Sequence, residues 1–403
     1  MSFLYAGYII FASILVFFLV FPFLKVLTSF FTRERIKRDI EVKDFDFGCI
    51  ITAYKNVEIT KPLVESLLRQ NYEKHIIYLV ADACDISDFG VKDERLLVLR
   101  PEEPLNLKAK SIIHAIENFR REHEYIEVFD GDNVTHPEFL KEINIFVNNG
   151  HTAVQGQRTA KNLDTIYACA DSTGEFYKNY VERYIPYLIG SSAVISGSGM
   201  AVEANLYKAY LASPEIEQGK HLWKKMLQED KILQNFLLRK NEKIAYAWNA
   251  IVFDEKVTSA EAVETQRTRW LYSYFQNIPN SLGILRRGLL KLSFNQLLFG
   301  LVTIAPPLFI LLFSAMAMAF IGIWINPIMS IVLVVAIAIF AGNILLSLYL
   351  SKVPKAIWKT IWGLPFFIFR QIRALFKMGN PNKNFKHTEH DRSYGIDDIL
   401  KPS

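Results

Sequence analysis

Two aspartates one residue apart follow a short apolar run near the middle of the first half of the chain. Residues 126–133 read Ile-Glu-Val-Phe-Asp-Gly-Asp-Asn, which places Asp130 and Asp132 directly after the run. The run suits a buried strand, and the Asp-Gly-Asp turn ends it. At the carboxyl end of a strand in an α/β sheet, such side chains face the crevice where ligands bind. Two carboxylates this close repel each other unless a cation lies between them, and their hard oxygens suit Mg²⁺ or Mn²⁺.

A site for a metal and a diphosphate is therefore one interpretation of this turn. The other is a polar turn with two solvated acids, because an isolated Asp-x-Asp is common. A second turn, at 196–200, reads Ser-Gly-Ser-Gly-Met. Its glycines would let the backbone approach a ligand, although an ordinary loop has the same composition.

Two later segments also carry side chains of chemical use. Glu229 and Asp230 open an expected helix at 232–238, where acids are favoured by the helix dipole in any case. They are a capping pair unless other observations give them a catalytic role. Residues 265–270 read Thr-Gln-Arg-Thr-Arg-Trp, a basic stretch closed by an indole. A solvated helix face with one half-buried aromatic residue would have the same sequence pattern.

The elements that must position these residues alternate between strands and helices. Strands are expected at 47–53, 76–81, 96–99, 126–130 and 153–157, and helices at 61–70 and 109–119. This order predicts an α/β domain with a mostly parallel sheet of nucleotide-binding type. No glycine-rich dinucleotide loop and no Walker lysine motif occurs in the sequence, which argues against dinucleotide and P-loop chemistry.

Composition points to a membrane and away from nucleic acid. Of the 403 residues, 51% are hydrophobic, and the net charge of +5 comes from basic residues beside apolar stretches. That arrangement is typical of charge next to a bilayer, so no nucleic-acid partner is expected. The three cysteines are scattered without metal-ligand spacing, as expected for reduced core residues of a cytoplasmic domain.

Three apolar stretches are long enough to cross a bilayer. They cover 4–24, 297–325 with a kink expected at Pro306 and Pro307, and 327–350. The basic residues that flank them place the N-terminus outside and residues 45–285 in the cytoplasm, as a multi-pass protein of the cell (inner or plasma) membrane. Residues 356–378 have the composition of a helix lying in the interface, although a fourth crossing stays open.

The expected domains follow from these segments. They are an N-terminal transmembrane anchor at 1–28, a cytoplasmic α/β domain at 29–290, two transmembrane helices plus the interfacial helix at 291–378, and a cytoplasmic tail at 379–403.

Taken together, the polar motifs form an ordered set. Asp82, Asp130-Gly131-Asp132, Glu229-Asp230 and Gln266-Arg267-Thr268-Arg269-Trp270 follow one another in the chain. The set resembles the membrane-bound glycosyltransferases of family 2, the synthases of cellulose, chitin, hyaluronan and poly-N-acetylglucosamine. The resemblance covers residues 47–270 and the membrane layout. It implies a GT-A fold and a nucleotide-diphosphate sugar donor, with uracil as the base.

The resemblance also implies roles for individual residues. The donor would be contacted by Thr52, Tyr54, Asn56, Asp82, Lys108, Asp130, Gln266, Arg267 and Arg269, and the acceptor by Gly197, Ser198, Gly199 and Trp270. The divalent metal, Mg²⁺ or Mn²⁺, would be bound by Asp130 and Asp132. The catalytic carboxylates would be Asp230, as general base, and Glu229 next to it. Two departures affect the donor site. Lys55-Asn56 stands where the family often has Asn-Glu, and Leu107 replaces a glycine before Lys108.

The chemistry agrees with these residue types. A sugar hydroxyl is a poor nucleophile, so a positioned carboxylate must take its proton. The leaving nucleoside diphosphate gains negative charge, which a divalent metal and Arg267 or Arg269 would stabilise. Attack opposite the leaving group inverts the anomeric carbon, so an α-linked donor gives a β-linked product. The enzyme expected is a metal-dependent inverting hexosyl- or N-acetylhexosaminyltransferase.

Three functions remain open at this point. The first is extension of a polysaccharide that is fed into the membrane, which the Gln-Arg-x-Arg-Trp element favours. The second is transfer of one sugar to a lipid carrier or a sphingolipid-like acceptor, because three spans are few for a polymer channel. The third, a non-catalytic nucleotide-sugar sensor, is opposed by the retention of every acidic signature residue. The donor sugar, the linkage, and any oligomer or secretion partner stay undetermined.

The orientation predicted from the charge bias can be tested by cysteine accessibility. A single cysteine placed near His151, in a variant with the three native cysteines replaced, should react with an impermeant thiol reagent only after the cells are opened. Labelling in intact cells would contradict the cytoplasmic assignment of residues 45–285.

Overall fold

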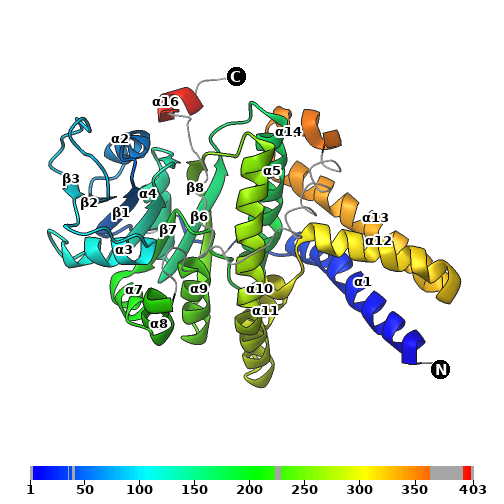
Figure 1. Cartoon of the computed structure of the whole chain (residues 1–403). Coiled ribbons are helices and arrows are strands. Elements are labelled where there is room, and N and C mark those ends of the chain that lie inside the picture. The colour runs from blue at the N-terminus through cyan, green and yellow to red at the C-terminus, as the bar shows by residue number, and fades with distance from the viewer. Residues whose placement is uncertain (1–2, 35, 39–40, 223–227, 364–393, 401–403) are drawn as a thin grey trace.

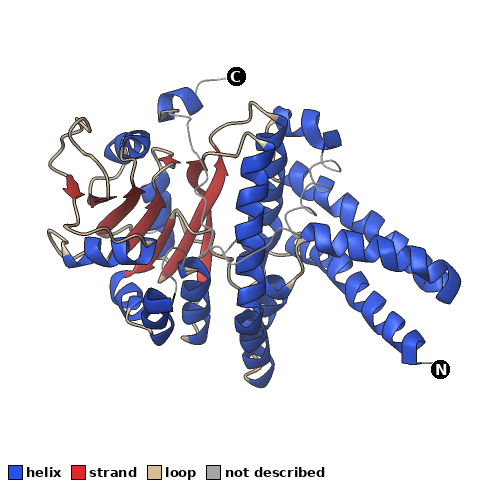
Figure 2. Ribbon diagram, viewed as in Figure 1, coloured by secondary structure: helices blue, strands red, loops and turns tan. Residues whose placement is uncertain are grey.

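The strands of the chain form one sheet beside a set of long helices (Figure 1, Figure 2). The computed structural model describes the chain apart from residues 1–2, 35, 39–40, 223–227, 364–393 and 401–403. Within the described residues the sheet has eight strands, in the order β3-β2-β1-β4-β7-β6-β8-β5. They are β1 (Phe47–Tyr54), β2 (His75–Asp82), β3 (Leu96–Leu99), β4 (Tyr125–Asp130), β5 (Val134–Thr135), β6 (Ala153–Ala160), β7 (Met200–Glu203) and β8 (Ile244–Asp254).

Most of these strands run in the same direction. β7 is antiparallel to both of its neighbours, β4 and β6, and β5 is antiparallel to β8, while the other pairs are parallel. The predicted mostly parallel α/β sheet is therefore confirmed. The register sets Tyr54 beside Asp82 and Thr52 beside Asp130. The carboxyl ends of β1, β2 and β4 thus meet at one edge, as expected for a ligand-binding crevice.

Short helices cover the sheet. They are η1 (Glu58–Thr60), α2 (Lys61–Leu68), α3 (Lys108–Glu117), α4 (Phe139–Asn148), α5 (Ile166–Lys178), the π-helix η2 (Asn179–Tyr184), α6 (Ile185–Leu188), α7 (Ala204–Leu211), α8 (Pro214–Leu222) and α9 (Glu229–Arg239). α2 joins β1 to β2, and α3 joins β3 to β4 on the other side of β1. Right-handed crossovers place these two helices on opposite faces of the sheet, as Figure 1 shows.

Burial explains the strand sequences. β2 is buried along its whole length, and Ile50, Leu79 and Val128 in the three central parallel strands are fully buried. A strand covered on both faces needs apolar residues at successive positions, without the alternation of a half-exposed strand. In α3, Ala109, Ile112 and Ala115 form the buried face at helical spacing.

Two helices connect the sheet to the apolar part of the chain. α10 (Ala260–Leu290) is capped by Ser259, whose hydroxyl accepts the N–H of Ala262, and it turns back into α11 (Phe294–Ile304). A Cβ on Gly288 would lie 2.4 Å from the nitrogen of Leu297, and one on Gly300 would lie 2.7 Å from the Cα of Leu285. The two helices pack backbone to backbone at these glycines, which fixes α10 to the segment that enters the apolar helices.

Three described helices are long and apolar enough to cross a membrane: α1 (Phe3–Ser29), α12 (Leu308–Ile325) and α13 (Pro327–Leu350). We name them together the apolar bundle. They extend away from the sheet side by side (Figure 1) and share a buried cluster that includes Leu15, Leu333 and Phe340. The prediction of three apolar stretches is confirmed. The kink expected at Pro306 and Pro307 is a full break, which separates α11 from α12.

The C-terminal part is described only in pieces. α14 (Lys355–Thr360) and the 3₁₀ turn η3 (Ile361–Gly363) cover the start of the predicted interfacial helix, and α16 (Ile396–Ile399) lies in the tail. The rest of the predicted helix, and most of residues 379–403, lie outside the described residues.

One carboxyl group in the core has no polar partner. Glu127 in β4 is fully buried between Cys49 and Ala201 on the neighbouring strands, and neither carboxylate oxygen has a hydrogen-bond partner among the described residues. Burial raises the pKa of Glu127 well above its ordinary value. The folded chain therefore keeps the proton at neutral pH, whereas the unfolded chain releases it.

Glu127→Met should stabilise the protein more at pH 8 than at pH 5. Above the ordinary carboxyl pKa the unfolded state gains by ionising and the folded state does not, so this group costs more stability as the pH rises. Removing an unpaired buried polar group should contribute about 1–3 kcal/mol. Thermal unfolding of the purified protein in detergent at both pH values measures this. Glu117→Met, on the exposed end of α3, serves as the control. Equal shifts at both pH values would contradict a buried, protonated Glu127.

Candidate active site

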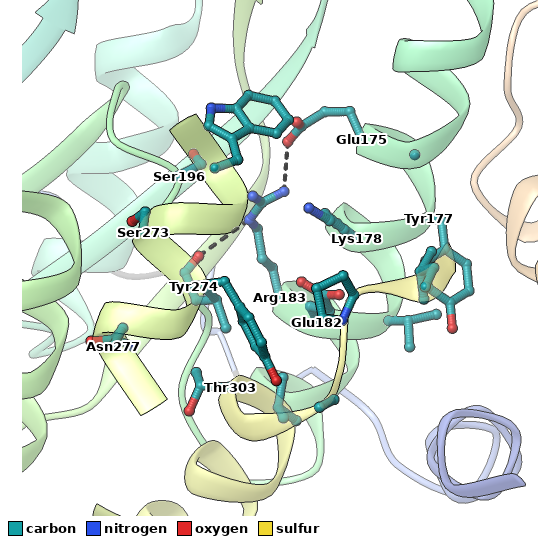
Figure 3. A pocket seen from close by; sticks show the side chains of 18 of the residues that line it. Glu175, Tyr177, Lys178, Glu182, Arg183, Ser196, Ser273, Tyr274, Asn277 and Thr303 are labelled. Atoms are coloured by element: carbon teal, nitrogen blue, oxygen red, sulfur yellow. Dashed lines mark hydrogen bonds and ion pairs between the residues drawn. The ribbon is translucent and has the colours of Figure 1, made fainter. Parts of the chain in front are cut away.

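A cavity of about 800 Å³ lies between the carboxyl edge of the sheet and the apolar bundle (Figure 3). Its lining includes Lys108, Asp130, Gly197, Glu229 and Asp230 at the sheet edge; Glu175, Tyr177, Lys178, Glu182 and Arg183 on α5 and η2; Arg267, Arg269 and Trp270 on α10; and Phe18, Pro22, Phe309, Leu312 and Phe340 on the apolar bundle. Three of the four motifs found in the sequence therefore line one cavity, and Asp82, from the fourth, does not.

Lys108 connects the carboxylates at the sheet edge. Its Nζ lies 2.6 Å from Asp130 Oδ1 and 3.7 Å from Glu229 Oε1, and it donates a hydrogen bond of 2.8 Å to the carbonyl oxygen of Gly197. Burial alone would lower the pKa of Lys108, but Asp130 and Glu229 outweigh it and raise the pKa. The ammonium is therefore charged, and it binds the ends of β4, the turn at 196–200 and the start of α9 at once.

The two acids that open α9 differ in environment. Burial raises the pKa of Glu229 to about 7, with Lys108 opposing and Asp230 adding to the shift. Asp230 Oδ1 accepts the N–H of Lys231 at 2.8 Å, and its other oxygen lies 3.5 Å from the Lys231 ammonium. Asp230 thus has a local contact typical of a first helical turn, yet it also lines the cavity.

The turn at 196–200 packs directly on the Asp-Gly-Asp turn. Ser198 is fully buried, and its hydroxyl accepts the N–H of Asp130 at 3.1 Å and bonds to the side chain of Asn133. Gly197 and Gly199 have φ angles of +87° and +62°, which favour glycine. A Cβ on Gly199 would come within 2.7 Å of Val252. Ser198 therefore joins the two turns, whereas Ser196 and Gly197 are the members of this turn that line the cavity.

Asp132 lies on the far side of the same turn. Its Oδ1 accepts the side-chain N–H of Asn133 at 3.3 Å, its Oδ2 accepts the N–H of Glu255 at 3.4 Å, and its carbonyl accepts the ammonium of Lys161 at 3.1 Å. Within the described residues no group of three or more His, Cys, Asp or Glu side chains is placed to hold a metal. Two carboxylates at a sheet edge fit Mg²⁺ or Mn²⁺ if substrate phosphates complete the coordination.

The basic element on α10 is partly buried. The Arg267 guanidinium is bonded to Asp171 Oδ1, and its carbon lies 4.5 Å from the centroid of the Trp270 ring. Burial lowers the pKa of Arg269. Gln266 Oε1 is buried without a hydrogen-bond partner among the described residues. The indole expected to stack on a sugar thus has a cation over its ring, and 36% of the Trp270 surface is exposed.

The remaining predicted donor residues lie at the sheet edge outside the cavity lining. Asp82 is buried, and its two oxygens accept the N–H groups of Leu105 and Asn106 at 2.8 and 2.7 Å. Tyr54 donates to the Asn106 side chain at 2.8 Å, and Asn56 accepts the N–H of Glu58. Asp82 and Tyr54 therefore hold the loop that leads into Lys108.

A buried ion network in the wall of the cavity was not predicted. Glu175 binds Arg158 at 3.0 Å and Arg183 at 2.7 Å, and Asp254 binds Lys256 at 2.7 Å and Arg158 at 3.4 Å. Burial opposes ionisation of Glu175, but the two arginines hold its pKa well below its usual range. Arg158 also donates to the carbonyl of Ser196 at 3.0 Å, so the network positions the turn at 196–200. Charges at 175, 178, 182 and 183 among tyrosines were the available signal in the sequence.

Comparison with known families decides the identity of this arrangement. The family model described as glycosyltransferase like family 2 matches residues 46–273, more than half of the chain. The chain belongs to glycosyltransferase family 2. No curated protein matches the sequence closely enough to serve as a relative.

Solved structures give the fold of this glycosyltransferase. The mannosyltransferase PcManGT from Pyrobaculum calidifontis, solved with GDP-Man and Mn²⁺, is 12% identical, with a TM-score of 0.50 over 91% of this chain and 99% of that one. S. aureus TarS 1-349 is 16% identical, with a TM-score of 0.40 over 60% of this chain and 65% of that one. The predicted GT-A-type fold is confirmed.

The pH dependence of Glu229 gives a test of the site geometry. Because Lys108 holds the pKa of Glu229 down against burial, Lys108→Met should raise that pKa above about 7. The acidic limb of the pH–rate profile should then move to higher pH, and the rate at neutral pH should fall. Lys108→Arg is the matched control, since it keeps the charge. An unchanged limb in the methionine variant would show that the two groups do not interact.

Proposed function

We propose that this family 2 glycosyltransferase transfers a sugar from a nucleotide-diphosphate sugar, probed first as UDP-sugars, to a hydroxyl of a lipid acceptor held in the membrane. The observation that carries this choice is the cavity itself, whose lining contains both the site carboxylates and apolar residues of the bundle. A lipid with its head at Asp230 and its tail against α1, α12 and α13 fits that lining. Extension of a polysaccharide, favoured by the Gln-Arg-x-Arg-Trp element, becomes the alternative.

The donor is assigned to the carboxyl edge of the sheet. Tyr54, Asn56 and Asp82 lie near the ends of β1 and β2, and Thr52 lies beside Asp130. Asp82 would act through the loop at 105–106 that its carboxylate holds, because both of its oxygens accept backbone N–H groups there. Lys108 would face the diphosphate while it orients Asp130.

Asp130 and Asp132 are assigned to a divalent metal, whose charge would stabilise the leaving diphosphate. On the other side of the reacting carbon, Asp230 would accept the proton of the acceptor hydroxyl. Arg269 would add positive charge near the departing group, and Glu229 would set the local field through Lys108. Attack opposite the diphosphate inverts the anomeric carbon.

We also propose that the apolar bundle spans the bilayer with the sheet domain on the cytoplasmic side. The exposed faces of the bundle support the first part, because Ile10, Phe320 and Val334 would otherwise lie in water. The flanking lysines and arginines support the second.

The function is tested by sizing products. The purified full chain, in nanodiscs with Mn²⁺, is incubated with labelled UDP-sugars and a membrane lipid extract. A single sugar on a lipid is expected, with no ladder of longer products. EDTA and Asp132→Ala should each reduce transfer by at least about 10²-fold, and added Mn²⁺ should restore only the EDTA-treated wild type. A polysaccharide ladder would overturn the lipid assignment, and full activity in EDTA would overturn the metal assignment.

The role of Asp230 needs a separate measurement, because its contact with Lys231 is also that of a helix cap. As a cap, Asp230→Asn should cost about 1 kcal/mol or less, since asparagine caps well. As a base, the same change should reduce kcat by about 10²–10⁴-fold while nucleotide binding and Tm stay near wild-type values. Glu229→Gln is the matched comparison. Near wild-type turnover of Asp230→Asn would return Asp230 to a structural role.

A further inference from the structure

Lys178 is a cation in the cavity that the transfer chemistry does not use. It is the last residue of α5, immediately before the π-helix η2, and π-helical turns are frequent at functional sites. Figure 3 shows its side chain directed into the cavity, near Glu175 and Glu182. The hydrogen bonds and ion pairs between described residues include none from its ammonium group. Glu182 and Glu175 are the carboxylates that act on this ammonium group, and neither forms an ion pair with it among the described residues, so a partly buried charge has no direct contact with an anion.

A second cation lies beside it. The Lys178 ammonium is 5.7 Å from the centroid of the Trp270 ring, and the Arg267 guanidinium carbon is 4.5 Å from the same centroid. Asp171 binds the guanidinium group of Arg267 and thereby fixes it against the indole of Trp270. Among the described residues that line the cavity, eight side chains are cationic and five are carboxylates. The excess of positive charge favours an anionic ligand here.

The lining changes character between the sheet and the bundle. Asp230 and Glu229 are at the sheet edge, whereas Tyr177, next to Lys178, stacks edge-on against Phe340 of α13 with the ring centroids 6.2 Å apart. α5 lies between the sheet and the apolar bundle (Figure 1). The cavity therefore extends from the charged sheet edge, past Lys178, to the apolar residues of the bundle.

We infer that the acceptor is a lipid with a phosphate between its hydroxylated head and its hydrocarbon tail, and that Lys178 and Arg267 bind this phosphate. This inference rests on the proposed lipid acceptor and names its chemical class. A hydroxyl would meet Asp230, the phosphate would meet the two cations, and the tail would lie against Phe309, Leu312 and Phe340. Two kinds of lipid share this chemistry: phospholipids with a polyol head, and polyprenyl diphosphates that carry a sugar.

The diphosphate of the donor is a less suitable partner for Lys178. The charged groups that act most on Lys178 are Glu182, Arg267, Glu175 and Arg183, and its ammonium lies 5.7 Å from the centroid of the Trp270 ring on α10. Lys108, by contrast, is in direct contact with Asp130. The two lysines therefore serve opposite ends of the site, with Lys108 toward the donor and Lys178 toward the acceptor.

The transfer reaction leaves the phosphate of the acceptor lipid unchanged. The acceptor oxygen forms a bond to the anomeric carbon, the bond from that carbon to the donor diphosphate breaks, and the electron pair leaves with the nucleoside diphosphate. The acceptor proton goes to Asp230. The phosphate bound at Lys178 keeps its charge throughout and contributes only binding and orientation.

The experiment compares acceptors that differ in the phosphate. The full chain is placed in phosphatidylcholine nanodiscs with a donor UDP-sugar and one of three probes: phosphatidylinositol, polyprenyl diphosphate-linked N-acetylglucosamine, or glucosyl diacylglycerol, which has no phosphate. Transfer to one phosphate-bearing probe should exceed transfer to glucosyl diacylglycerol at least about 10-fold. Which of the two is used separates the polyol phospholipid from the polyprenyl carrier.

Variants then assign the phosphate to Lys178. Lys178→Met should raise the KM for the preferred acceptor about 10- to 100-fold, the loss expected for one charged hydrogen bond, and should leave the KM for the donor near its wild-type value. Lys178→Arg should recover most of the loss. Lys208→Met, an exposed lysine on α7, is the control for expression and handling.

The outcomes distinguish failure of the phosphate site from failure of the lipid acceptor. If glucosyl diacylglycerol is used as well as the phosphate-bearing probes, or if Lys178→Met leaves the acceptor KM unchanged, the phosphate site is wrong while the lipid acceptor stands. If no lipid accepts sugar and the donor is built into a ladder, the lipid acceptor itself is wrong. A rise in donor KM with no change in acceptor KM would move Lys178 to the donor site.

Discussion

The ion pair between Lys108 and Asp130 is the contact on which the rest of the site depends. Three segments that are far apart in the sequence meet at one ammonium group: the end of β4, the turn that contains Gly197, and the start of α9 with Glu229. Without that cation, Asp130, Glu229 and Asp230 would repel one another in a buried space. The requirement explains why a lysine stands at the first position of α3, where a helix dipole by itself favours an acid.

A second set of charges also holds the turn that contains Gly197. Arg158 joins Glu175 to Asp254 and also binds the carbonyl of Ser196, so the turn lies between two cations, Lys108 and Arg158. Burying so many charges costs desolvation energy that pairing only partly offsets. What the chain gains is a fixed position for a glycine-rich turn that would otherwise be free to move. Preorganised charge of this kind is the main way in which enzymes stabilise a leaving group.

The local parts of this architecture were open to prediction from the sequence. Apolar runs predicted β1, β2, β3 and β4, and the two acids after the last of these runs predicted that Asp130 lies at the carboxyl edge of the sheet. Both predictions depend only on residues that are close together in the sequence. Contacts that depend on distant segments were not predictable in this way. Ser198 was predicted to contact the acceptor, and only its hydrogen bonds to Asn133 and Asp130 show that it joins two turns. No role was predicted for Lys178 or Glu175, because α5 and α10 come together only in the folded chain. β7 gave no signal because its four residues pair antiparallel between distant strands.

The long helix α10 has a mechanical consequence. Its far end packs on α11 through Gly288 and Gly300 without intervening side chains, and α11 is followed, after the break at Pro306 and Pro307, by α12 of the apolar bundle. From Leu290 back to Trp270 the helix extends about 30 Å at about 1.5 Å per residue, so a tilt of about 5° at one end displaces the other by about 2–3 Å. Pro279, within this part of α10, removes one backbone hydrogen bond from the helix. In the membrane-spanning arrangement proposed above, the thickness and lateral tension of the bilayer would act on the indole of Trp270 and the guanidinium groups beside it.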